Sequence, residues 1–185
     1  EEIAAYKMAI DLDHTYEDAY FNLGIAYGSK GMVDEEIRTY QKVIELDSKS
    51  SEALYNLGHA YRGKEMYDAS IAVFKKAIEI NPTLVDAYFN LGVSYGKKGL
   101  LDEEIQQYKK VLDLNPNSAE AHFNLGIAYG EKKMFEHQVG EYKKAIAINP
   151  KYAKAYKNLE STYRKKGMKE EADKELSRYN NLVKH

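Results

Sequence analysis

The residues closest to a catalytic motif in this sequence are Gly58-His59-Ala60-Tyr61-Arg62-Gly63-Lys64-Glu65. They follow the pattern of a phosphate-binding loop up to the last position, where such a loop needs Ser or Thr to hold magnesium. That loop also needs a preceding strand, whereas Gly58 and Tyr61 occupy positions that recur along this chain in a helical pattern. We therefore expect helix here and no nucleotide site.

The other reactive side chains also lack the spacing that catalysis or metal binding requires. The five histidines do not share a helix face at ligand spacing, and we expect His122 to pack in the core. The acidic pairs Glu35-Glu36 and Glu103-Glu104 recur with the repeat described below, which favours helix starts over acid–base pairs. Cysteine is absent, which excludes thiolate metal sites. We expect no catalytic residue, no metal site and no cofactor, and hence a protein that is not an enzyme.

Composition removes two further classes of partner. The 185 residues include 27 Lys and Arg against 29 Asp and Glu, for a net charge of −2. This balance lacks the basic footprint of a nucleic-acid binder. No apolar run approaches membrane-spanning length and nothing resembles a signal peptide. We expect a soluble, cytoplasmic protein with no nucleic-acid partner and no membrane insertion.

A repeat of 34 residues organises the whole chain. Pro82, Pro116 and Pro150 are separated by this interval, and a fixed period of that size is typical of repeat architectures. Aligning the chain at this period produces a leucine row, a tyrosine row and a glycine row: Leu23, Leu57, Leu91, Leu125 and Leu159; Tyr27, Tyr61, Tyr95, Tyr129 and Tyr163; Gly24, Gly58, Gly92 and Gly126, with Glu160 last.

Each repeat is predicted to hold two helices. In the first, Tyr20, Leu23, Gly24 and Tyr27 recur at the spacing of one helix face. The glycine costs about 1 kcal/mol relative to alanine in a helix, so we expect it to allow close approach of the paired helix.

The second helix follows a break that contains glycine, such as Ser29-Lys30-Gly31. Asp34 is a candidate cap at its start, where acidic residues suit the helix dipole. It should end near Asn81-Pro82, because proline disfavours helix in the preceding residue.

These motifs resemble the tetratricopeptide repeat, on the residues Tyr20-x2-Leu23-Gly24-x2-Tyr27 followed by Tyr40 and Val43. The resemblance implies an all-α fold, a right-handed α-solenoid of antiparallel helix pairs. It also implies a general binding scaffold. We expect the following divisions: the second helix of an incomplete repeat at 1–16, full repeats at 17–50, 51–84, 85–118 and 119–152, and a fifth repeat at 153–185 that acts as C-terminal cap.

In this family the first helices line the concave surface, so the resemblance places the stripe opposite the core residues in the groove. We call this stripe the predicted binding face. It comprises an acidic row, an aromatic row, an asparagine row and a mixed apolar row: Asp18, Glu52, Asp86 and Glu120; Phe21, Tyr55, Phe89 and Phe123; Asn22, Asn56, Asn90, Asn124 and Asn158; Ile25, His59, Val93 and Ile127, with Arg62 beside His59.

Two features of this face have two interpretations each. The asparagines can pair with the backbone of an extended peptide, as the similar asparagine ladder in the repeats of O-linked GlcNAc transferase implies; or they are simply part of the repeat consensus. His59 and Arg62 can hold a carboxylate or phosphate; or they are a solvated interruption of the apolar floor.

The predicted function is a non-catalytic protein-interaction scaffold that binds a protein or an extended peptide, apolar with some basic residues. The face turns basic at its C-terminal end through Lys154, Lys157, Arg164 and Lys165, and nine Lys and Arg against five Asp and Glu give residues 153–185 a net charge of +4. The alternative is a self-assembling structural module, or a targeting or substrate-recruiting arm of a larger protein.

Two apolar surfaces bear on that alternative. In residues 1–16, Ile3, Tyr6 and Ile10 belong to a helix without its first partner, so we expect them to form an open surface suited to self-association. A further row lies in the turns between helices and is either a second docking edge or local packing: Met32, Met66, Leu100, Met134 and Met168.

Overall fold

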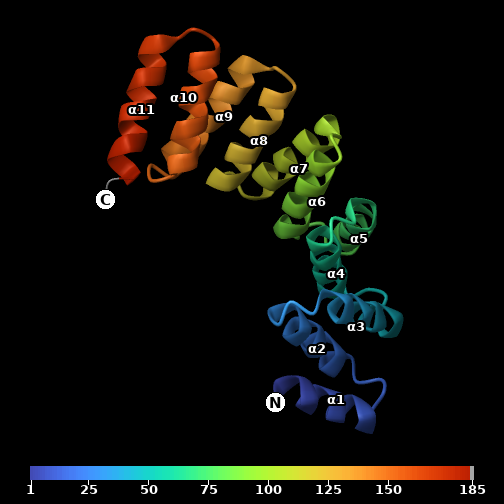
Figure 1. Ribbon diagram of the computed structural model, residues 1–185. Helices are drawn as coiled ribbons and strands as arrows, with labels where there is room; N and C mark the ends of the chain where they lie inside the picture. The colour runs from blue at the N-terminus through green and yellow to red at the C-terminus, as the bar shows by residue number, and fades with distance from the viewer. Residues whose placement is uncertain (184–185) are drawn as a thin grey trace. The chain divides into compact units, whose positions relative to one another are not determined.

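The computed structural model describes residues 1–183, and these residues form eleven α-helices joined by short turns (Figure 1). The helices are α1 (Glu2–Leu12), α2 (Glu17–Ser29), α3 (Val33–Leu46), α4 (Ser51–Gly63), α5 (Tyr67–Ile80), α6 (Val85–Lys97), α7 (Leu101–Leu114), α8 (Ala119–Glu131), α9 (Phe135–Ile148), α10 (Ala153–Lys165) and α11 (Lys169–Val183). The even-numbered helices are the predicted first helices of the repeats.

The chain divides into two compact units, Glu1–Lys98 with α1 to α6 and Gly99–His185 with α7 to α11. Within each unit every helix packs against its neighbours in the sequence. Short turns make these neighbours antiparallel (Figure 1). Each unit is thus a stack of antiparallel helices, which confirms the predicted all-α solenoid class.

The glycine row exists because an aromatic ring occupies the place of its side chains. A Cβ atom added at Gly24 would lie 2.7 Å from the Tyr40 ring, and one at Gly58 would lie 2.6 Å from Phe74. These rings come from the second helix of the same repeat and are almost fully buried. The expected close approach of the helix pair is confirmed.

The turn inside each repeat uses one residue in the left-handed region. Gly31, Gly99 and Gly167 adopt positive φ angles, as do Glu65 and Lys133 at the equivalent positions. A side chain there is strained by about 1–2 kcal/mol.

The second helices start differently from the prediction, because Met32 and not Asp34 is the N-cap of α3. Asp34 lies in the first turn and pairs with Lys64 of the next repeat. The same pairing joins Asp68 to Lys98 and Asp102 to Lys132. The carboxylate therefore links consecutive repeats, a role that its position in one helix does not reveal.

The helix α1 does not leave its predicted surface open. Ile10 is buried against Ala19, Leu23 and Tyr27, and Ile3 and Tyr6 are half-buried in the same cluster. The prediction of an open self-associating surface at Ile3, Tyr6 and Ile10 is therefore wrong, because α2 covers these side chains.

The fifth repeat places most of the charges of α11 in water, with Glu175 as an exception. This glutamate is buried and accepts from Arg178 Nη1 at 2.9 Å. Glu160, which replaces the row glycine, is also buried and accepts from Arg164 Nε at 2.6 Å. The role of 153–185 as a cap stays a prediction, and its last two residues lie outside the described part of the chain.

Candidate functional site

The predicted binding face lies on α2, α4 and α6 in one unit and on α8 and α10 in the other. Its acidic row is fully accessible, because Asp18, Glu52, Asp86 and Glu120 are all exposed. Each stands in the first turn of its helix, where a carboxylate also suits the helix dipole.

The aromatic row is only partly accessible in the first unit. Phe21 lies edge-on to Tyr40 with ring centroids 5.8 Å apart, and Tyr55 lies 6.0 Å from Phe74. Phe21, Tyr55 and Phe89 are half-buried. Part of each ring is therefore accessible to a ligand, and the rest packs against the second helix of the repeat.

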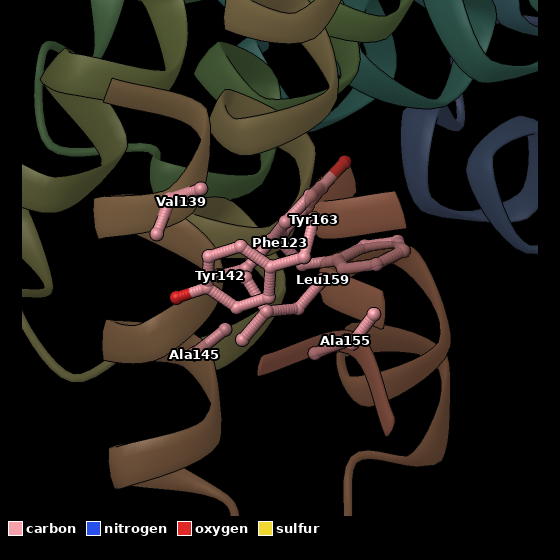
Figure 2. Packing of buried hydrophobic residues seen from close by; sticks show 8 residues of the cluster. Phe123, Val139, Tyr142, Ala145, Ala155, Leu159 and Tyr163 are labelled. Carbon is pink, nitrogen blue, oxygen red and sulfur yellow. The ribbon is translucent and has the colours of Figure 1, made fainter. Parts of the chain in front are cut away.

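Phe123 differs from the rest of its row and corrects the prediction. It is only 8% exposed and belongs to the core of the second unit with Tyr142 and Leu159 (Figure 2). Its ring centroid lies 5.7 Å from that of Tyr142 and 5.0 Å from that of Tyr152. Phe123 is therefore mainly a core residue.

The mixed apolar row contains the most accessible apolar side chain of this face. Ile25 is 48% exposed, while Val93 and Ile127 are half-buried. Ile25 thus exposes apolar area to water beside Phe21 and Asn22, and a partner that covered this area would gain free energy from its burial.

The asparagine row is held in one orientation by hydrogen bonds. Nδ2 of Asn22, Asn90 and Asn124 donates to the carbonyl oxygen four residues earlier, at 2.7, 2.9 and 2.9 Å. Asn56 hydrogen-bonds the hydroxyl group of Tyr40, and Asn158 Nδ2 donates to that of Tyr142 at 3.4 Å. The amide nitrogens are therefore engaged within the protein, which fixes the orientation of each amide group.

His59 and Arg62 lie together on the face in the first unit, and Arg62 supplies the positive charge. His59 is exposed, and desolvation together with the nearby Arg62 charge lowers the pKa of its imidazole. Among the described residues Arg62 Nε is buried without a hydrogen-bond partner. The binding of an anion here stays a prediction.

Arg62 fits its position because the facing residue of the second helix is small. In two other repeats this position is Gly28 or Gly130, where a Cβ atom would lie 2.9 Å from Glu36 Oε1 or 2.3 Å from Gln138 Nε2. The residue that corresponds to Glu36 and Gln138 in the repeat of Arg62 is Ser70. A large residue at one of the two facing positions therefore goes with a small residue at the other.

Sequence reasoning missed the burial of one ionisable group and the partner of another. Glu104 was interpreted as a helix-start residue, but it is buried, and desolvation with the Glu131 charge raises the pKa of its carboxyl group to about 7. His122 is buried as predicted, but its Nδ1 lies 2.5 Å from Glu141 Oε2. The fold, rather than any local pattern, brings these partners together.

The row in the turns divides between the two interpretations. Met32, Met66 and Leu100 are exposed N-cap residues, whereas Met168 packs against the core of the second unit. Met134 is half-buried, so local packing describes the last member, and a docking edge at the first three stays a prediction.

The phosphate-loop pattern is part of a helix. Gly58 and Gly63 both lie in α4, Gly58 faces Phe74 and Lys64 pairs with Asp34. Within residues 1–183 no group of three or more His, Asp or Glu could hold a metal ion. None of the described helices combines the length and the apolar run needed to cross a membrane.

Comparison with known families agrees with the helix pairs. The family described as TPR repeat matches residues 3–31, 60–99 and 100–133, which is more than half of the chain. The chain belongs to the tetratricopeptide-repeat family. Related families described as tetratricopeptide repeat match residues 18–50, 39–72 and 119–152 of this tetratricopeptide-repeat protein.

Solved structures share the fold over most of their length. A crystal structure of MamA is 27% identical, with a TM-score of 0.85 over 88% of this chain and 95% of that one. YrrB, described as a TPR protein with an unusual peptide-binding site, is 25% identical, with a TM-score of 0.81 over 96% and 92%. MamA from Desulfovibrio magneticus RS-1, at 21% identity, a TM-score of 0.86 and coverage of 91% and 95%, shows the fold alone. Comparison with curated protein sequences gives no match.

Proposed function

We propose that this tetratricopeptide-repeat protein is a non-catalytic scaffold that binds an extended segment of a partner protein on the predicted binding face. The observation that carries the proposal is the exposure of Ile25 one helical turn after the ring of Phe21 and the oriented amide of Asn22. Such a strip combines apolar area with a hydrogen-bonding group held in place.

The asparagine orientation supports contact with a peptide backbone. Because Nδ2 of Asn22, Asn90 and Asn124 donates to its own helix, Oδ1 points away from that carbonyl and is able to accept a backbone N–H. Backbone contacts are independent of the side chains of the ligand. The asparagine ladder of O-linked GlcNAc transferase repeats, which this row resembles, supports the same use.

Charge supports a ligand that carries apolar anchors and some Lys or Arg. The exposed carboxylates Asp18, Glu52 and Asp86 lie at the edge of the face in the first unit. Charges at the rim tune association rate and specificity more than affinity, so the anchors must come from the apolar side chains. YrrB, a fold relative with a peptide-binding site, agrees with a peptide ligand.

The experiment selects ligands from a phage library of random 12-residue peptides and measures the best synthetic peptide by titration calorimetry. The double variant Asn22→Ala/Asn90→Ala should weaken binding about tenfold, and by a similar factor for unrelated selected sequences. Asn180→Ala, on the exposed surface of α11, is the matched control. Unchanged affinity in the double variant would refute the backbone contact.

The alternative function, self-assembly, has one specific observation in its favour. On α1 the exposed apolar side chains are Met8 and Leu12, at 68% and 86%, in place of the three that were predicted. Light scattering after size exclusion, with Met8→Glu/Leu12→Glu as the variant, separates a monomer from an assembly. A monomeric wild-type protein would exclude this alternative.

A further inference from the structure

A cavity in the second unit adds a chemically distinct site to the predicted binding face. It has a volume of about 510 Å³ and is lined by α8, α9 and α10 and the turns that follow α8 and α10. Cavities of roughly 300–1,000 Å³ are typical of ligand pockets. Ile127 and Phe135 contribute apolar side chains to its lining, and Gln138, Tyr142 and Asn158 contribute polar ones. Of the lining residues, the sequence placed Ile127 and Asn158 on the predicted face and Lys165 at its basic end.

The absence of a side chain at Gly130 leaves room for the side chain of Gln138 in the lining of the cavity. A Cβ atom at this position would lie 2.3 Å from Gln138 Nε2, so any larger residue would displace the glutamine. The next repeat has Arg164 at the equivalent position.

The polar part of the lining is an ordered hydrogen-bond network. Tyr142, which is 2% exposed, receives Asn158 Nδ2 at 3.4 Å and also hydrogen-bonds Gln138. The hydroxyl group of Thr162 donates to the carbonyl oxygen of Asn158 at 2.7 Å. Both amides are thus held in place before a ligand arrives, which lowers the entropy cost of binding.

The rim of the cavity carries an excess of positive charge. Lys133 and Lys165 are exposed lining residues, and no described carboxylate forms an ion pair with either. Lys166 Nζ lies 4.9 Å from the centroid of the Phe135 ring. Glu131 is the one acidic side chain in the described lining. An occupant with a negative charge complements this rim, and its uncharged part suits the walls of Ile127 and Phe135.

We propose that this cavity holds an acidic side chain, Asp or Glu, of the bound segment, with a neighbouring apolar side chain against Ile127 and Phe135. The inference rests on the proposed function and names a specificity site within it.

The test begins with the selected random 12-residue peptides and compares their composition with that of the starting library. We expect enrichment of Asp or Glu beside an apolar residue. For the best such peptide, Lys133→Gln/Lys165→Gln should weaken binding about tenfold. The same double variant should change little for a peptide in which the acidic residue is replaced by its amide.

Two matched variants separate the cavity from general charge effects. Lys151→Gln/Lys174→Gln makes the same charge change at exposed sites outside the cavity and should leave the affinity unchanged. Gly130→Ala should weaken the acidic peptide because Gln138 must move, whereas Gly140→Ala, in open space on α9, should not.

Each outcome decides the inference. Selected peptides that need Asn22 and Asn90 but show no acidic enrichment, or that are indifferent to Lys133 and Lys165, would overturn this inference and leave the proposed function standing. A failure to select any binding peptide would overturn both.

Discussion

The hydroxyl group of Tyr55 accepts a hydrogen bond from Asn90 Nδ2 at 3.4 Å, across consecutive first helices of the first unit. In other repeats the equivalent asparagine reaches a tyrosine of the preceding second helix, as Asn56 reaches Tyr40 and Asn158 reaches Tyr142. The repeat of Tyr55 has Phe74 at that second-helix position. In this repeat the hydroxyl group is therefore on Tyr55 of the first helix instead of on the ring of the second helix, and Asn90 still has a hydroxyl partner.

Exchange of these two rings tests whether the hydroxyl group matters for stability. Tyr55→Phe should lower the free energy of unfolding by about 0.5–1.5 kcal/mol, since one hydrogen bond to Asn90 is lost. Adding Phe74→Tyr should recover most of that loss, because its hydroxyl group would take the position that Tyr40 uses toward Asn56. Urea unfolding followed by circular dichroism measures this. Independent, additive losses in the double variant would contradict the exchange.

Two glycines of the second unit should respond oppositely to alanine. A Cβ atom at Gly126 would lie 2.7 Å from the ring of Tyr142, which is buried in the core (Figure 2). Gly126→Ala should therefore destabilise by about 1–3 kcal/mol. Gly140 lies inside α9 with no neighbour within 4 Å, so Gly140→Ala should stabilise by about 0.5–1 kcal/mol. Thermal unfolding compares both with wild type, and a stabilised Gly126→Ala would refute the packing argument.

Glu104 should make stability fall as the pH rises. Burial, followed by the Glu131 charge, raises the pKa of its carboxyl group from 4.5 to about 7, against a hydrogen bond from Tyr108. Between these values the folded protein keeps a proton that the unfolded chain releases, so the free energy of unfolding decreases with pH over this window.

The variant Glu104→Gln removes that titration. It should be more stable than wild type at pH 8, by about 3 kcal/mol at most, and equal to it near pH 4. Urea unfolding across the pH range measures the difference, with Glu103→Gln as the control for the change in charge. A constant difference at all pH values would contradict the assignment.

The sequence predicted the helix pairs well because their determinants are local. The spacing of Leu23, Gly24 and Tyr27 defines a helix face, and the break at Gly31 needs a positive φ angle. Even the role of Gly24 follows from its periodic position, although the ring that fills its place, Tyr40, is 16 residues away.

The errors came from contacts between repeats, which periodicity alone does not determine. Phe123 shares its row with Phe21, but it packs in a core cluster with Leu159 of the next repeat. Asp34 has the sequence position of a cap, but it pairs with Lys64 of the next repeat. The cavity near Gly130 is lined by three helices together, so no single helix predicts it. The sequence held one indication of it: Gly130 is matched with Gln138, whereas another repeat matches Arg62 with Ser70.

The most direct test of the central claim compares two exposed isoleucines. Ile25 on α2 is 48% exposed on the predicted binding face, and Ile80 at the end of α5 is 40% exposed away from it. Titration calorimetry of a selected peptide should show at least a tenfold loss of affinity for Ile25→Glu, because a charge replaces an apolar contact. Ile80→Glu should bind as wild type does, with both variants equally helical by circular dichroism. Full affinity in a folded Ile25→Glu variant would contradict binding at this face.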